Sequence, residues 1–148
     1  LVRSGLSAEW LEVELTERLA LHDIDYAVSQ MNQLRDLGVR LAMDDFGTGY
    51  SSLSYIQILP LTLLKLDRSF VVNIESDHIA YEIVSAVIKI AKSKKIEVIA
   101  EGIETPRQAI ILREAGCDYA QGYLYGKPMP ADKIEEYFEQ NEKHRQIF

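Results

Sequence analysis

The sequence of 148 residues contains only one cysteine, Cys117, so an internal disulfide framework is excluded and a reducing, cytoplasmic setting is predicted. No apolar run approaches the ~20 residues that a membrane-spanning helix needs, and none has the flanks of a signal peptide. Basic residues are outnumbered, because 16 Lys and Arg stand against 23 Asp and Glu for a net charge of −7. A surface of that sign repels long nucleic acids, so neither DNA nor RNA is an expected partner.

Histidine is also scarce, and His22, His78 and His144 share no ligand-like spacing, which argues against a histidine zinc site. The pair His22-Asp23 is also found in His-Asp metal phosphohydrolases, but no further histidines complete such a site. There is no Gly-Lys-Ser or Gly-Lys-Thr sequence, which excludes a Walker loop. The composition, 47% hydrophobic and 26% charged, is typical of one soluble globular domain.

Short strand-like runs alternate with longer amphipathic segments along the chain. The predicted strands are residues 10–15, 39–43, 61–66, 97–100 and 118–122. The predicted helices are residues 24–37, 52–59, 79–94, 106–115 and 131–141. Several helix ends carry boundary signals: Asp77 and Thr105-Pro106 at starts, Gly38 and Gly116 at stops.

This alternation predicts an α/β fold with parallel strands joined by crossover helices. Two architectures are compatible with it: a (β/α) barrel of the TIM type, or an open doubly wound sheet. A whole barrel takes ~250 residues, so 148 residues would supply about five of its eight β/α units, whereas an open sheet suits the length better. No repeat or linker divides the chain, so residues 1–148 are expected to be one domain or a contiguous part of one.

Polar or ionised side chains recur at or near the carboxyl ends of all five predicted strands. They are Glu14, the pair Asp44-Asp45, Lys65 with Asp67, Glu101, and Gln121. Each of these residues by itself could belong to an ordinary turn or helix cap. Turns and caps do not explain why polar residues recur at successive strand ends. Lys65 stands between two leucines that point to the opposite face, so it is expected inside, where a lysine needs a charged partner. In α/β folds, this edge of the sheet is where ligands bind.

The residue types indicate a chemistry. Carboxylates and an amide suit hard divalent cations such as Mg²⁺ or Mn²⁺, and three or four carboxylates can hold two of them. A lysine among them stabilises hydroxide or the charge that grows on a phosphoryl oxygen. The class of reaction indicated is metal-assisted hydrolysis of a phosphodiester.

A competing interpretation starts from the glycines. Gly47-x-Gly49 follows a strand, and Asp67 lies twenty residues beyond Gly47, as in a dinucleotide-binding turn. Ser52 stands where the third glycine belongs, and the two preceding aspartates would face a pyrophosphate without a counter-charge. We regard this interpretation as the weaker one.

With these residues in view, the sequence resembles the C-terminal part of an EAL domain, a family of bacterial cyclic di-GMP phosphodiesterases and of degenerate relatives that only bind the nucleotide. The matching segments are LEVELTE (11–17), DDFGTGYSSL (44–53), LKLDRSFV (64–71), VIAEGIET (98–105) and QGYLYGKPMP (121–130). The resemblance covers essentially the whole chain, in order. It implies part of a TIM-type barrel and hydrolysis of cyclic di-GMP to linear pGpG.

The resemblance also implies a role for each matching residue. The expected metal ligands of a two-metal Mg²⁺ or Mn²⁺ site are Glu14, Asp44 and Asp45. The expected catalytic residues, near the attacking water and the phosphate, are Lys65, Glu101 and Gln121. Glu17 is expected to tether the loop after the paired aspartates, and Asp67 to lie at the periphery of the substrate site. The loop at residues 44–53 and the helix after it are expected to contribute to a homodimer.

The sequence departs from the family pattern in what it lacks. The name-giving Glu-Ala/Val-Leu motif, a ligand-contacting arginine and an asparagine metal ligand would all lie upstream of Leu1, in ~100 further residues. We therefore expect little activity from the 148 residues alone and hydrolysis from a complete domain. The alternative is a degenerate module that binds cyclic di-GMP or mediates dimerisation without cleaving it. A parent protein could be anchored to a membrane through other domains.

Overall fold

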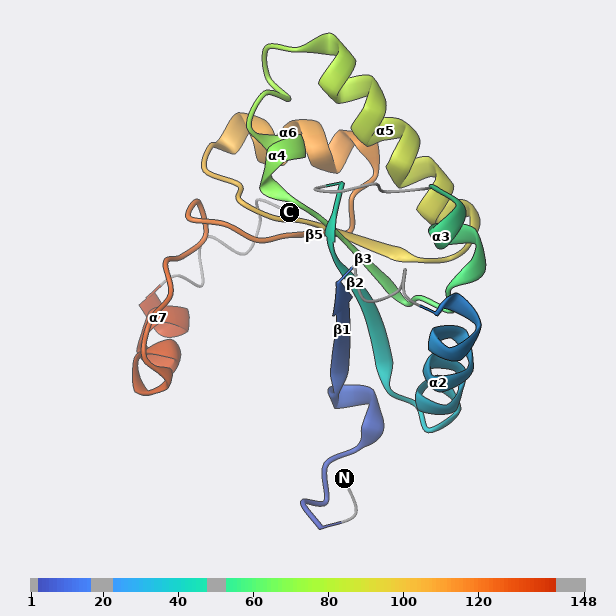
Figure 1. Cartoon of the computed structure of the whole chain (residues 1–148). Coiled ribbons are helices and arrows are strands. Elements are labelled where there is room, and N and C mark those ends of the chain that lie inside the picture. The colour runs from blue at the N-terminus through green and yellow to red at the C-terminus, as the bar shows by residue number, and fades with distance from the viewer. Residues whose placement is uncertain (1–2, 17–22, 48–52, 141–148) are drawn as a thin grey trace.

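Five parallel strands form one sheet, and their order in the sheet is their order in the chain (Figure 1). The computed structural model describes residues 3–16, 23–47 and 53–140. The strands are β1 (Glu12–Thr16), β2 (Arg40–Phe46), β3 (Leu63–Leu66), β4 (Glu97–Ala100) and β5 (Tyr119–Ala120). A doubly wound sheet reverses its strand order at a switch point, whereas consecutive order is the arrangement of a (β/α) barrel. The sheet thus has the order of five successive barrel units.

Helices follow the strands largely where the periodicity predicts them. They are η1 (Ala8–Trp10), α2 (Ile24–Asp36), α3 (Leu53–Ile58), α4 (Arg68–Val71), α5 (His78–Ser93), α6 (Pro106–Ala115), η2 (Ala131–Lys133) and α7 (Ile134–Gln140). The prediction missed η1 and α4, because three or four residues are too short to show a helical period. The predicted end residues Ser52 and Asn141 lie outside the described residues.

The predicted helix boundaries are confirmed by their hydrogen bonds. The Asp77 carboxylate accepts from the backbone N–H of Ile79 at 2.8 Å, and Thr105 forms a capping box with Gln108 at the start of α6. Gly116 ends α6 with φ 97°, in the left-handed region that glycine adopts without strain.

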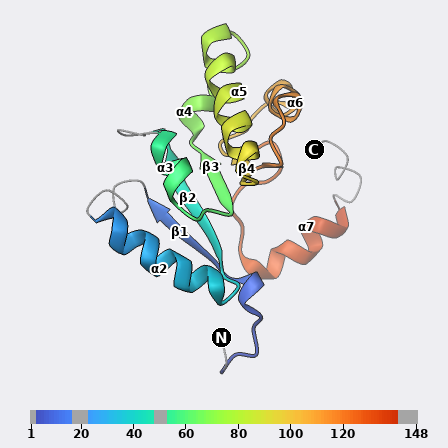
Figure 2. The same ribbon diagram turned by 90° about the vertical axis from the view of Figure 1, so that its right-hand side faces the viewer.

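The two faces of the sheet differ sharply in character. Alternate residues of β2, β3 and β4 point to the helices and are almost wholly buried: Leu41, Met43, Leu64, Leu66, Val98 and Ala100. Figures 1 and 2 show α2, α3, α5 and α6 on this side of the sheet. The parallel register places most of the ionic side chains of the strands on the other face: Glu12, Glu14, Arg40, Asp44, Lys65 and Glu97. The apolar core therefore lies between sheet and helices, and the charged face is the one that a barrel turns inward.

Strand β2 runs farther than predicted and contains an irregularity at its carboxyl end. Met43 pairs with Leu64 and Phe46 pairs with Leu66, so Asp44 and Asp45 together oppose the single residue Lys65. Asp45 has φ 54°, a left-handed conformation that aspartate tolerates better than most residues. This β-bulge explains why two like charges stand side by side in the sequence: both belong to one position of the ladder.

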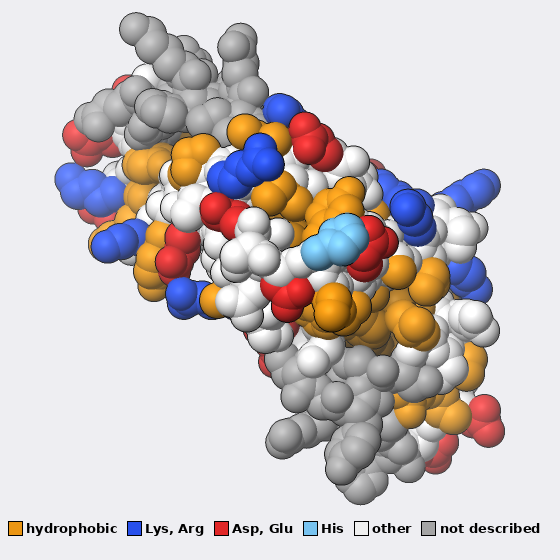
Figure 3. Space-filling model, turned by 90° about the horizontal axis from the view of Figure 1, so that it is seen from above, with side chains coloured by type: hydrophobic (Ala, Val, Ile, Leu, Met, Phe, Trp, Pro, Cys, Tyr) orange, Lys and Arg blue, Asp and Glu red, His pale blue; other side chains and the backbone are white. Residues whose placement is uncertain are grey.

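Large apolar side chains are exposed on two neighbouring helices. Leu53 and Ile58 on α3, and Ile79 and Ile83 on α5, are each at least 44% exposed. Figure 3, which views the molecule from above, shows hydrophobic side chains gathered in patches between charged ones. None of the described helices combines the length and the apolar character that crossing a membrane requires.

Cys117 is buried, with its thiol directed at the carbonyl oxygens of Val98 and Tyr119 at 3.3 and 3.2 Å. Burial raises the pKa of this thiol to about 11. We expect iodoacetamide at pH 8 to alkylate Cys117 at least about a hundredfold more slowly in the native chain than in urea, because only the thiolate reacts. Mass spectrometry of timed samples measures both rates, and equal rates would contradict the burial described.

Candidate active site

Four side chains from four parts of the sheet meet at one ammonium group. Lys65 Nζ, on the central strand β3, lies 2.8 Å from Glu14 Oε1, 2.9 Å from Asp44 Oδ1 and 3.0 Å from Glu101 Oε1. Glu14 belongs to β1, Asp44 to the bulge of β2, and Glu101 directly follows β4. The structure thus brings together four of the predicted site residues, which we call the Lys65 cluster. It also supplies the charged partners that an inward lysine was expected to need.

The cluster is arranged to keep Lys65 charged. The lysine side chain is only 12% exposed, and this burial by itself lowers its pKa. The nearby carboxylates of Glu14, Asp44 and Glu101 outweigh burial, so the pKa of Lys65 is raised above its ordinary value. Lys65 is therefore an ammonium at neutral pH, which suits it to stabilise negative charge and not to act as a general base.

The donor atoms of the cluster fit a hard divalent cation, since all of them are carboxylate oxygens. Asp44 Oδ1 is buried and has no hydrogen-bond partner among the described residues, so its contact with Lys65 is an ion pair without a well-directed hydrogen bond. No group of three acidic, histidine or cysteine side chains within the described ranges is arranged around a metal position. In this structure the three carboxylates of the cluster surround the lysine ammonium instead.

The segment after Glu101 is held by residues that sequence reasoning missed. Gly102 has φ 72°, and a Cβ there would lie 2.5 Å from Cγ of Arg68, so the arginine side chain packs directly on the glycine. Arg68 also pairs with Glu104 at 2.7 Å, and Gln108 accepts from the Glu104 N–H at 2.9 Å. The sequence contains the capping-box signature Thr105-x-x-Gln108, whereas no local sequence pattern predicts the contact of Arg68 with Glu104.

The remaining predicted site residues lie outside the cluster. Gln121 follows β5, and its backbone bonds Ala100 and Ile103, but no contact of its exposed side chain with the cluster is seen in the described part of the chain. The Asp67 carboxylate accepts from the Ser69 N–H at 2.9 Å and caps α4, and hydrogen bonds from Ser69, that of its side chain above all, lower the pKa of Asp67. Asp45 is exposed beside Asp44, and Glu17, the predicted tether, lies outside the described residues. The roles of these four residues, like those of the cluster residues, stay predictions.

A second ionic group occupies the amino ends of the strands on the same face. Arg40 contacts Glu12 at 3.3 Å and Glu97 at 2.8 Å, and the Tyr119 hydroxyl donates to Glu97 at 2.9 Å. In TIM-type barrels, chemistry is done at the carboxyl ends of the strands, and residues at the amino ends serve stability. We assign this group to the interior packing of the fold.

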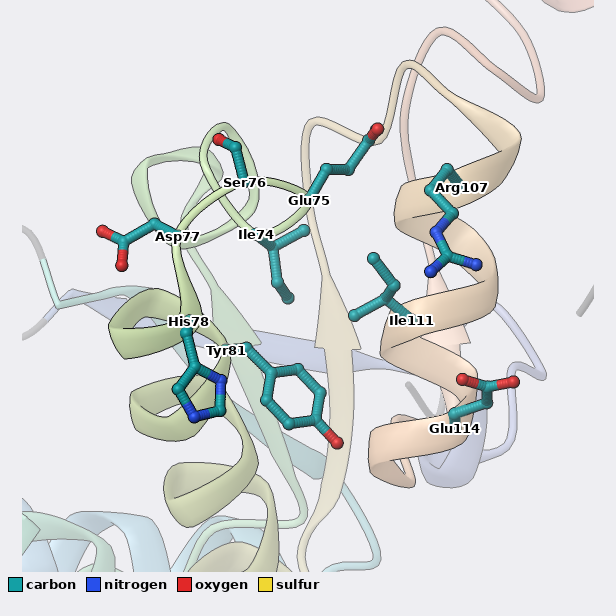
Figure 4. A pocket seen from close by; sticks show the side chains of 9 residues that line it. All are labelled: Ile74, Glu75, Ser76, Asp77, His78, Tyr81, Arg107, Ile111 and Glu114. Atoms are coloured by element: carbon teal, nitrogen blue, oxygen red, sulfur yellow. The ribbon is translucent and has the colours of Figure 1, made fainter.

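A pocket on the helical side of the molecule contains several ionisable side chains. It has a volume of about 360 Å³ and opens between α5 and α6, with His78 and Tyr81 on one wall and Arg107 and Ile111 on the other (Figure 4). None of the residues of the Lys65 cluster lines it. The pocket is therefore separate from the candidate active site.

Comparison with known proteins identifies the family of this chain. The family model of the EAL domain matches residues 1–128. NbdA of Pseudomonas aeruginosa, named a cyclic di-GMP phosphodiesterase, is 46% identical over 137 residues, which make up 93% of this chain and 18% of that protein.

Solved structures agree with the fold. PaMucR phosphodiesterase in a c-di-GMP complex matches with a TM-score of 0.83 and 40% identity, over 90% of this chain and 54% of that one. Klebsiella pneumoniae BlrP1 in a manganese/cy-diGMP complex matches with a TM-score of 0.80 and 32% identity, over 86% of this chain and 33% of that one. The sequence thus spans about half, or less, of the proteins that it matches, and the sheet of five strands is part of a TIM-type barrel.

Proposed function

Since the chain belongs to the EAL domain family, we propose that it forms part of a metal-dependent phosphodiesterase that opens cyclic di-GMP to linear pGpG in bacterial signalling. The observation that carries the proposal is the convergence of Glu14, Asp44 and Glu101 on Lys65 at the carboxyl ends of the strands. Relatives named as phosphodiesterases and structures of relatives in complex with the nucleotide support it.

Each residue of the cluster has a part in this chemistry. Glu14 and Asp44, with Asp45 beside it, would hold Mg²⁺ or Mn²⁺ through their carboxylates, and such ions, when bound, acidify water and neutralise phosphate charge. Lys65, kept as an ammonium, stabilises the negative charge of the attacking oxygen and of the phosphoryl group. Glu101, whose Oε1 lies 3.0 Å from Lys65 Nζ, would take the proton of the attacking water. Gln121 is proposed to hydrogen-bond near the phosphate, and Asp67 to border the nucleotide.

The test is hydrolysis by the complete EAL domain that contains these 148 residues. With Mg²⁺ or Mn²⁺ present, chromatography should show cyclic di-GMP converted to linear pGpG, and chelation by EDTA should stop the conversion. Nucleotide binding without conversion, measured by calorimetry, would instead identify a binding module. The 148 residues by themselves should be inactive, because they cover 54% of the PaMucR chain and leave the strand edges of β1 and β5 unpaired in the sheet.

We also propose a homodimer through the loop at residues 44–53 and α3. Residues 48–52 of that loop lie outside the described residues, but the apolar Leu53 and Ile58 on α3 are exposed. Leu53→Glu should convert the complete domain from dimer to monomer, because a charge would be buried at the interface. Light scattering after size exclusion measures the mass. The matched control is Phe138→Glu on α7, which should leave the mass unchanged, and a dimeric Leu53→Glu variant would contradict the proposal.

A further inference from the structure

We propose that Lys65 acts as a resident cation: it holds the three carboxylates together without metal, and its ammonium must leave them for a divalent cation to bind. Lys65 would then set the metal affinity of the site as well as serve the reaction. The inference rests on the proposed function only in taking these carboxylates as the place where the metal binds.

The contacts of Lys65 use the oxygens that a metal would need. Glu14, Asp44 and Glu101 each direct one carboxylate oxygen at Nζ within 3.0 Å. A divalent cation that binds the same oxygens meets a positive charge already in place, so it must displace that charge. This displacement weakens metal binding relative to a site without the lysine.

When a metal binds, the group that moves is the side chain of Lys65 and not the carboxylates. Glu14 and Asp44 lie on paired strands, and the Glu101 N–H donates to Leu66 O at 3.0 Å, so the backbones that carry the carboxylates are fixed by the sheet. Lys65 lies on β3 between them, with four side-chain carbons between its backbone and its charge. Exchange of ammonium for metal therefore needs rotation of one side chain and no change in the sheet. The displaced ammonium stays tethered near the reacting groups, where the proposed reaction uses it.

The net charge of the cluster is compatible with exchange of the ammonium for a divalent cation. Three carboxylates and one ammonium sum to −3 + 1 = −2, which one divalent cation neutralises. Without Lys65, the same three carboxylates would carry −3 at close range. Their mutual repulsion would then be relieved only by an external cation.

The experiment measures Mn²⁺ binding to the complete EAL domain, without nucleotide, by the loss of the free-Mn²⁺ signal in electron paramagnetic resonance. Lys65→Met removes the charge and keeps most of the side-chain volume. Its Mn²⁺ dissociation constant should be at least about tenfold lower than that of the wild type. The matched control is Lys89→Met on the exposed surface of α5, which changes the net charge equally and should leave the constant within about twofold.

Two further measurements complete the test. Lys65→Arg keeps the cation, so its dissociation constant should be no lower than that of the wild type. In metal-free buffer, Lys65→Met should unfold at a lower temperature than the wild type, and Mn²⁺ should raise its melting temperature by more. If Lys65→Met is unfolded without metal, Mn²⁺ should restore its near-ultraviolet circular dichroism, and a failure to do so would overturn the proposal.

Equal Mn²⁺ affinity in wild type and Lys65→Met would also overturn the inference while leaving the proposed hydrolysis intact. Conversely, tighter Mn²⁺ binding by Lys65→Met in a domain that does not cleave cyclic di-GMP would uphold the inference and remove the proposed function. The absence of Mn²⁺ binding in every variant would overturn the inference.

Discussion

In the complete EAL domain, Lys65→Ala should lower kcat for cyclic di-GMP hydrolysis by about 10²- to 10³-fold, the loss typical of removing one preorganised charge stabiliser. The dissociation constant for the nucleotide should stay within a few fold of the wild type. In the proposed role, the ammonium faces charge that grows during the reaction, so it would contribute more to the transition state than to the bound substrate. Single-turnover kinetics and calorimetry measure the two quantities separately.

Glu101→Ala should show the same separation of rate from affinity, because its carboxylate is proposed to act on the attacking water and not on the guanine bases. Lys89→Ala, on the exposed surface of α5, serves as the control and should retain full activity. Losses of equal size in kcat and in nucleotide affinity would show that Lys65 and Glu101 hold the ground-state nucleotide instead. The same Lys65 variants, tested for Mn²⁺ binding, separate the effect on the metal from the effect on the reaction.

The second large effect is expected from Gly122→Ala. A Cβ at Gly122 would lie 2.1 Å from the backbone oxygen of Ile103 and 2.3 Å from its nitrogen. The same two atoms of Ile103 bond the neighbouring turn: its N–H donates to Gln121 O at 3.1 Å, and its oxygen accepts from the Leu124 N–H at 3.0 Å. One added methyl group must therefore separate two backbone segments and break these bonds. Gly122→Ala should lower the free energy of unfolding by about 3 kcal/mol.

Urea unfolding of the 148-residue chain, followed by circular dichroism, measures this change. Gly5→Ala is the matched control: Gly5 has φ 66° and open space around it, so the substitution should cost only the strain of a left-handed residue, about 1 kcal/mol. Unfolding midpoints that coincide for Gly122→Ala and the wild type would refute the close approach of Ile103. Because Ile103 lies two residues after Glu101, the substitution should also lower activity in the complete domain.

Much of the fold could be predicted from local sequence. The helix α6 begins and ends where Thr105-Pro106 and Gly116 predict, because a cap and a stop act within a few residues of the helix end. The strand β4 likewise matches the apolar run EVIA. Elements without a local period were missed, as α4 shows: its four residues are defined by the Asp67 cap and by packing of Val71 in the core.

The candidate site, like the fold, could be predicted from the sequence only in part. Strand-end position predicted that Glu14, Asp44, Lys65 and Glu101 belong together, because parallel strands present their carboxyl ends at one edge. The same criterion selected Gln121, whose side chain is exposed and makes no hydrogen bond with the cluster among the described residues. Position along a strand says which edge a residue occupies, but it does not say where the end of a side chain lies.

The sequence by itself determined the alternation of strands and helices, the apolar face of the sheet and the set of polar residues at its carboxyl edge. These follow from periods of two and 3.6 residues and from side-chain chemistry, which act locally. Only the tertiary structure decided that Asp44 and Asp45 share one ladder position opposite Lys65, and that Lys65 is the cation on which three carboxylates converge. Strand register and bulges depend on pairing between segments far apart in the chain, and no local pattern specifies that pairing.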